Sequence, residues 1–181
     1  MTSATTSSLV SAAVSAAEAS QNEAQLRHEL ENALEQACAE LVIPWTPFQL
    51  ERALKVKGKP TKFADVAHGA VVIEYEPPKS FGGRSGAKAI HARRQAEEYA
   101  ELISAEEGRD LGEYVLIAWD GAHITFGQFI DAAATWEDIV TFDGISAERL
   151  LSALASNGRP LVHPQLLQAL VGPDSEYGTA L

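Results

Sequence analysis

Three carboxylates stand close together in the sequence, around a short hydrophobic segment that has the pattern of a β-strand. Asp65 comes first, and Glu74 and Glu76 follow within residues 71–76. Side chains alternate along a strand, so Glu74 and Glu76 project from the same face. Carboxylates a few ångströms apart resist burial, and a hard divalent cation removes that cost. The chemistry that this spacing predicts is the binding of Mg²⁺ or Mn²⁺.

A hairpin would bring Asp65 onto the same face. The pair His68-Gly69 separates two hydrophobic runs, which predicts a two-residue turn at these positions. In that register Asp65 lies opposite Val72, and directly opposed residues of a hairpin share a face. The alternative is a solvated strand face whose acids are only polar surface residues. The spacing alone gives the two interpretations equal weight.

Hydrophobic periodicity predicts the elements that would position these residues. In chain order they are a helix over 22–42, a short strand within 49–56, the hairpin over 63–76, a helix over 89–104, strands over 114–119 and 123–128, a helix over 146–154, and a short helix after Pro164. This order of elements predicts an α/β fold with a central mixed β-sheet flanked by helices, and with C-terminal helices.

Composition divides the chain into three parts. Residues 1–20 are nearly all Ser, Thr, Ala and Val, and we expect them to form a flexible leader, helical in part after Leu9. Residues 21–145 would form the α/β domain. Residues 146–181 would form a C-terminal helical extension, which would lead into a further domain if the chain is a fragment of a longer protein.

Charge and cysteine content narrow the function classes. The net charge of −11 and the pI near 4.8 argue against a broad basic surface that coats nucleic acid, so any contact with DNA must be local. The single cysteine, Cys38, allows neither an internal disulfide nor a cysteine zinc site. No segment approaches the roughly 18 apolar residues that span a bilayer. We therefore expect no membrane partner and a reducing, cytoplasmic compartment.

A wider pattern resembles the PD-(D/E)XK, or restriction-endonuclease-like, nuclease superfamily. Its parts occur in the family's order: a helix opened by Asn22-Glu23, the acid Asp65, a strand carrying Glu74, and a helix carrying Gln95-x-x-x-Tyr99. In that superfamily a helix Glu, a strand Asp and a following (D/E)-x-K hold Mg²⁺, and the Q-x-x-x-Y helix marks the RecB-like and Cas4-like members. The phrases IEYEPPKSF and QAEEYAELI also resemble the N-terminal nuclease-like regions of bacterial restriction-modification and phage-defence proteins.

The resemblance implies roles for individual residues. The implied catalytic residues are Asp65, Glu74, Glu76 and Lys79. The implied metal ligands are Asp65, Glu74, Glu76 and Glu23. The residues implied to support the site or contact DNA are Gln95, Tyr99, Arg93 and Arg94.

The chain departs from the family at one position. Glu76 stands where the family has the lysine that orients the attacking water. Some members carry Glu at this position, and others bring a lysine from a neighbouring element. Lys79 is the nearest candidate, with Lys62, Arg93 and Arg94 as others. The departure puts catalytic competence in question and leaves the predicted fold unaffected.

Several other groups carry less weight. The histidines are scattered, without the spacing of a zinc site. A cationic run includes Lys79, Arg84, Lys88, Arg93 and Arg94, and such a run is usually a solvated face.

Three functions remain open on the sequence. The leading expectation is a Mg²⁺-dependent DNA phosphodiesterase domain of a prokaryotic restriction or phage-defence system, with a methyltransferase-type or helicase-type component, fused or separate, as partner. The second is a catalytically weak or inactive nuclease-fold module for DNA binding or complex assembly. The third is an interaction domain whose acids are surface residues.

Overall fold

The computed structural model describes residues 4–45, 66–82 and 86–158 of the 181-residue chain. Its helices are α1 (Ala4–Ala19), α2 (Glu23–Glu40), α3 (Ala87–Glu107) and α4 (Gly144–Asn157), with short 3-10 helices η1 (Ser80–Gly82) and η2 (Leu111–Glu113). Its strands are β1 (Val66–His68), β2 (Val71–Tyr75), β3 (Val115–Trp119), β4 (His123–Ile130), β5 (Ala133–Trp136) and β6 (Val140–Thr141).

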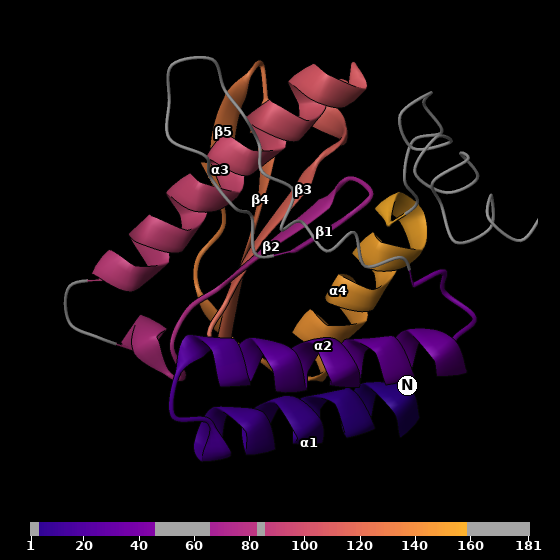
Figure 1. Ribbon diagram of the computed structural model, residues 1–181, viewed down its shortest axis with the longest axis vertical. Helices are drawn as coiled ribbons and strands as arrows, with labels where there is room; N and C mark the ends of the chain where they lie inside the picture. The colour runs from indigo at the N-terminus through magenta and orange to yellow at the C-terminus, as the bar shows by residue number, and fades with distance from the viewer. Residues whose placement is uncertain (1–3, 46–65, 83–85, 159–181) are drawn as a thin grey trace, which may run out of the picture.

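The strands form one mixed sheet. Their order is β1-β2-β3-β4-β5, with β6 paired to β4. Strands β2 and β3 run parallel, and the remaining described pairs are antiparallel. A parallel pair needs a long crossover, which α3 supplies. Figure 1 shows α3 along one face of the sheet, and α1, α2 and α4 pack on the other. The predicted α/β fold, a central mixed sheet flanked by helices, is confirmed.

Alternation along β2 assigns its side chains to the two faces. Ile73 and Tyr75 belong to the larger hydrophobic cluster, which includes the buried sides of α1, α2 and α4. Val72 belongs to a second cluster, which it shares with Tyr99 and Ile103 of α3. Residues of β2 with even numbers therefore face α3, and those with odd numbers face the other helices.

The expected flexible leader is in fact a packed helix. Residues 4–19 form α1, and Leu9, Ala13 and Ala17 are buried in the larger cluster. Their spacing of four residues places them along one side of the helix. Small alanine side chains let α1 lie close against α2, so a segment without aromatic anchors still contributes to the core.

The hairpin is present, but its predicted turn is wrong. The turn residues are Gly69 and Ala70, and Val72 pairs with Ala67 instead of Asp65. His68 belongs to strand β1, and its ring is buried, with its centroid 4.2 Å from that of the Trp45 ring. Gly69, with φ at 59°, then takes the left-handed backbone conformation that glycine adopts without strain.

Most other predicted elements are confirmed with small changes in their ends. Helix α2 begins after Asn22, whose side chain accepts a hydrogen bond from the Gln25 amide at 2.9 Å. Helix α3 ends at Gly108, which adopts the left-handed conformation. Helix α4 follows the capping residue Asp143, and packs in the same core as the sheet. Strands β5 and β6 were not predicted.

The strand expected within 49–56 and the helix expected after Pro164 lie outside the described residues. Within the described ranges, no helix has the length and apolar character needed to cross a membrane.

Candidate functional site

Two buried carboxylates lie at the carboxyl end of β2. Glu74 is paired with Ala118 of β3, and Glu76 follows the strand, with its amide donating to the Trp119 carbonyl at 3.1 Å. Each residue is only 1% exposed. Ala118 packs with Ala92 of α3, so both carboxylates are on the side of the sheet that α3 covers. A carboxylate buried to this degree needs a positive partner or a metal ion.

The first turns of α3 supply partners for Glu76. Nζ of Lys88 lies 2.9 Å from Oε2, and Nδ1 of His91 lies 2.9 Å from Oε1. The two bases are three residues apart, which puts them on one side of the helix. Their side chains are 52% and 49% exposed, whereas that of Glu76 is 2% exposed. A carboxylate from the interior thus holds two bases at the surface.

The charge of Lys88 is stabilised by this arrangement. The short contact with Glu76 is the main cause that raises the pKa of Lys88, and the negative charges of Glu76 and Glu23 raise it further. Glu23 is the first residue of α2, and Figure 1 shows the start of α2 beside η1, at the end of the sheet where β2 terminates. The predicted helix acid therefore lies within electrostatic range of Lys88, on the opposite side of the sheet from α3.

Lys79, the residue expected to replace the family lysine, is placed differently. It is exposed, has φ at 58°, and its backbone amide donates to the Asp120 carbonyl at 3.2 Å. Lys88, not Lys79, contacts the acid at position 76. From the sequence, Lys88 is recognised only as one member of a cationic run. His91 is recognised only as one of several scattered histidines. The missed signal is their spacing of three residues at the start of a helix.

The predicted supporting pair lies on the expected helix. Tyr99 is buried against the sheet with Val72 and Leu116, on the face that carries Glu74. Gln95 is partly buried one helical turn earlier. The structure therefore brings the Q-x-x-x-Y helix over the face with the two buried acids.

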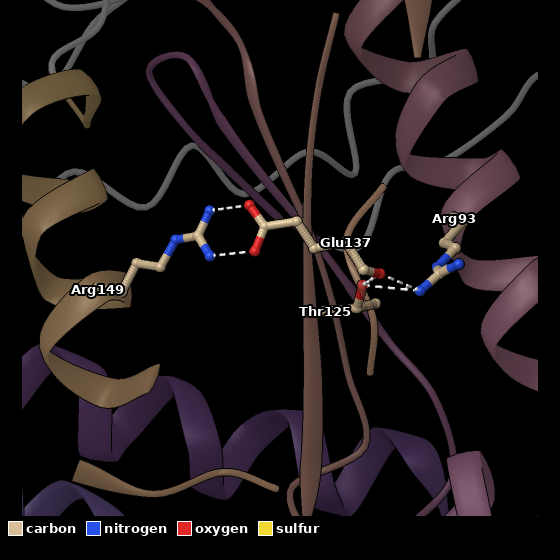
Figure 2. Close-up of polar contacts among 4 residues, drawn as sticks. All are labelled: Arg93, Thr125, Glu137 and Arg149. Atoms are coloured by element: carbon tan, nitrogen blue, oxygen red, sulfur yellow. Dashed lines mark hydrogen bonds and ion pairs between the residues drawn. The ribbon is translucent and has the colours of Figure 1, made fainter. Parts of the chain in front are cut away.

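Arg93, predicted to contact DNA, is used within the fold (Figure 2). Its Nη2 donates to Oγ1 of Thr125 at 2.8 Å and to the Glu137 carbonyl at 2.7 Å. Its guanidinium lies 5.4 Å from the centroid of the Trp136 ring. The carboxylate of Glu137 pairs with Arg149 of α4 through both oxygens. This chain of contacts ties α3 to α4 past the end of β5.

Arg94, the neighbouring candidate, faces the surface. Its side chain is 69% exposed and its Nε lies 4.0 Å from Oε1 of Glu98, one helical turn away. Of the two predicted arginines, Arg94 is therefore the one positioned to meet a partner.

Asp120 is a third buried acid near this end of the sheet, but its oxygens are occupied. They accept hydrogen bonds from the amides of Phe81 at 2.7 Å, Ala122 at 3.0 Å and His123 at 2.6 Å. These contacts fix η1 and the turn between β3 and β4. Asp120 therefore shapes the backbone beside the candidate site.

The described residues fit a hard cation in ligand type. Mg²⁺ takes oxygen ligands and commonly uses one or two carboxylates together with water and substrate phosphate. Glu74 and Glu76 supply two carboxylates at one strand end. No group of three or more His, Cys, Asp or Glu side chains within the described ranges is arranged to hold a metal. Asp65, the expected third ligand, lies outside those ranges.

No family model, curated protein or solved structure matches the chain. The side chains gathered at the carboxyl end of β2 are therefore the basis for assigning a function.

Proposed function

We propose that this chain is a divalent-metal-dependent DNA phosphodiesterase domain whose site is formed by Glu74, Glu76 and Lys88. One contact carries the proposal: the Lys88 ammonium lies 2.9 Å from the Glu76 carboxylate. The PD-(D/E)XK pattern normally has a lysine two residues after the strand acid, which is Glu74 here. Here that position is glutamate, and Lys88 from α3 brings its ammonium to that glutamate.

Each residue then has a distinct task. Glu74 and Glu76, with Asp65 as the further candidate ligand, would hold Mg²⁺ or Mn²⁺. A bound divalent cation supplies Lewis acidity toward a phosphodiester oxygen and acidifies water. Without metal, Glu76 stabilises the charge of Lys88. With metal bound, Lys88 would bind a phosphate oxygen. Helix α3 packs on the face of the sheet that carries the acids.

DNA would have to approach a small region of the surface. With a net charge of −11, most of the molecule repels a phosphate backbone. Arg94 and Lys88 lie on one helix, and their side chains are 69% and 52% exposed. A restriction or phage-defence setting, with a methyltransferase-type or helicase-type partner, follows only from the sequence resemblance.

One observation favours a second function, an inactive nuclease-fold module for DNA binding or assembly. Both oxygens of Glu76 have basic partners, Lys88 and His91. Lys88 offsets the charge that would otherwise attract a metal ion, and His91 occupies the second oxygen. Such a protein would use the same fold without cleaving DNA.

Metal titration and cleavage together test the proposal. Calorimetry with Mn²⁺ and cleavage of plasmid and single-stranded DNA are measured on the wild type, Asp65→Ala and Glu74→Gln, with Arg94→Gln as a surface control for metal binding. The proposal expects wild-type binding and Mn²⁺-dependent cleavage, both lost in the two acid variants. Metal binding without cleavage supports the inactive module. No binding at millimolar Mn²⁺ indicates an interaction domain whose acids have other roles.

A further inference from the structure

The position of Lys88 has a consequence for metal binding, which rests on the proposed function. Its ammonium is 2.9 Å from a buried carboxylate oxygen and within electrostatic range of a second acid, Glu23, on another helix. A cation is most stable where such negative charges converge. The place that would favour a divalent ion is therefore already taken by a side-chain cation.

The bond between Lys88 and Glu76 is nevertheless incomplete. Although Nζ is close to Oε2, no well-directed hydrogen bond from the described residues reaches this buried oxygen. The contact is therefore a short ion pair and not a well-directed hydrogen bond. A buried oxygen without a directed donor remains open to a stronger ligand.

Lys88 is also able to leave. Half of its side chain is exposed, and it lies in the first turn of α3, whereas the residues that anchor this end of the helix to the sheet are Ala89 and Ala92. Moving its flexible four-carbon chain outward exposes no core. The contact of His91 with Oε1 would remain.

We propose that, without metal, the Lys88 ammonium occupies the divalent-cation position, so that Lys88 and the metal ion compete for Glu76. Metal binding displaces the ammonium outward, toward the surface where a phosphate would lie. Lys88 thus has two states, an internal counter-ion in the metal-free protein and a phosphate ligand in the metal-bound protein. The metal ion selects between them.

The test uses the neutral variant Lys88→Met, which keeps the length of the side chain. If the ammonium holds the site in about nine of ten molecules, its removal tightens Mn²⁺ binding about tenfold. The matched control is Arg94→Met, which removes one positive charge from the exposed side of the same helix and should change binding less than about twofold at physiological salt. Calorimetry gives both affinities, and circular dichroism verifies that each variant is folded.

A second measurement needs no variant. The wild-type protein is pulse-labelled with an amine-acetylating reagent, and acetylation of Lys88 is measured by peptide mass spectrometry at increasing Mn²⁺. The expected result is acetylation that rises severalfold as the metal binds, while Lys79 stays unchanged.

The outcomes separate the two proposals. Equal or weaker Mn²⁺ binding by Lys88→Met, or acetylation of Lys88 unaffected by saturating metal, overturns the competition. If Lys88→Met binds Mn²⁺ and the wild type does not, the result supports competition between Lys88 and the metal ion. If neither protein binds Mn²⁺ and labelling does not respond, the proposed metal-dependent function fails, and the competition fails with it.

Discussion

Nδ1 of His91 lies 2.9 Å from Oε1 of Glu76, so one buried carboxylate is shared by two bases of the same helix. A positive side chain at position 76 would lie next to Lys88 and His91 and would remove the negative charge that pairs with Lys88.

We therefore expect Glu76→Lys to be strongly destabilising. The buried ammonium would face Lys88 and His91 without a counter-charge, which should lower the free energy of unfolding by about 3–5 kcal/mol. Urea denaturation measures the change. The double variant Glu76→Lys with Lys88→Glu restores opposite charges and should recover part of the loss. Wild-type stability in the single variant would contradict a contribution from this cluster.

Arg93 and Arg94 offer a matched pair on neighbouring positions. Arg93→Met removes the donor to Thr125 and to the Glu137 carbonyl, and should cost about 2–3 kcal/mol because hydrogen bonds from charged groups are strong. Arg94→Met should change stability by less than about 0.5 kcal/mol. DNA binding, measured at low salt on folded variants, should show the opposite order: Arg94→Met should weaken binding more than Arg93→Met. Equal stability of the two would argue against the role of Arg93 in Figure 2.

Helix α1 should behave as part of the core. Leu9→Ala removes a side chain that is buried among α1, α2 and α4, and is expected to lower the free energy of unfolding by about 2–5 kcal/mol. Val14→Ala, on the exposed side of the same helix, should have an effect below about 0.5 kcal/mol. Thermal or urea unfolding distinguishes them, and similar small effects would mean that α1 is dispensable.

Cys38 makes stability depend on alkaline pH. Burial, together with the nearby charge of Glu31, raises the pKa of the Cys38 thiol to about 11. The folded state therefore favours the neutral thiol. Its contribution is complete below the pKa of the unfolded thiol and is lost as the pH rises through about 11.

The measurement is urea unfolding from pH 8 to 11, in the wild type and in Cys38→Ala. The wild type should lose up to about 2–3 kcal/mol more than the variant over this interval. Burial also raises the pKa of Tyr114, but this group is common to both proteins and cancels in the comparison. Parallel pH curves would show that the thiol does not contribute.

Local signals in the sequence account for the elements that were predicted correctly. Asn22 is a strong N-cap, which marks the start of α2. Residues 114–119 are hydrophobic throughout, which marks β3 as a buried strand. Strand β5 was missed because it follows Asp131 and Ala132, which both have positive φ without a glycine to mark the turn. The pairing of β4 with β5 holds Asp131 and Ala132 in this conformation. That pairing cannot be read from the residues of the turn alone.

The candidate site shows the same division. Alternation alone places Glu74 and Glu76 on one face of β2. The partner of Glu76 depends on how α3 sits on the sheet, and the sequence leaves every nearby cation as a candidate. In the hairpin, His68 is buried against Trp45 and pairs with Val71. A prediction from turn residues alone does not take this contact into account.

The larger hydrophobic cluster joins the first and last described helices, since Leu9 and Ala13 of α1 share it with Leu150 and Leu154 of α4. These contacts have a high sequence separation, and such contacts slow folding because a long loop must close before they form. During synthesis, α1, α2 and the strands leave the ribosome before α4 is available. Until residue 157 has emerged, the apolar sides of α1 and β3 cannot all be covered, and the nascent chain exposes them to chaperones and to other chains.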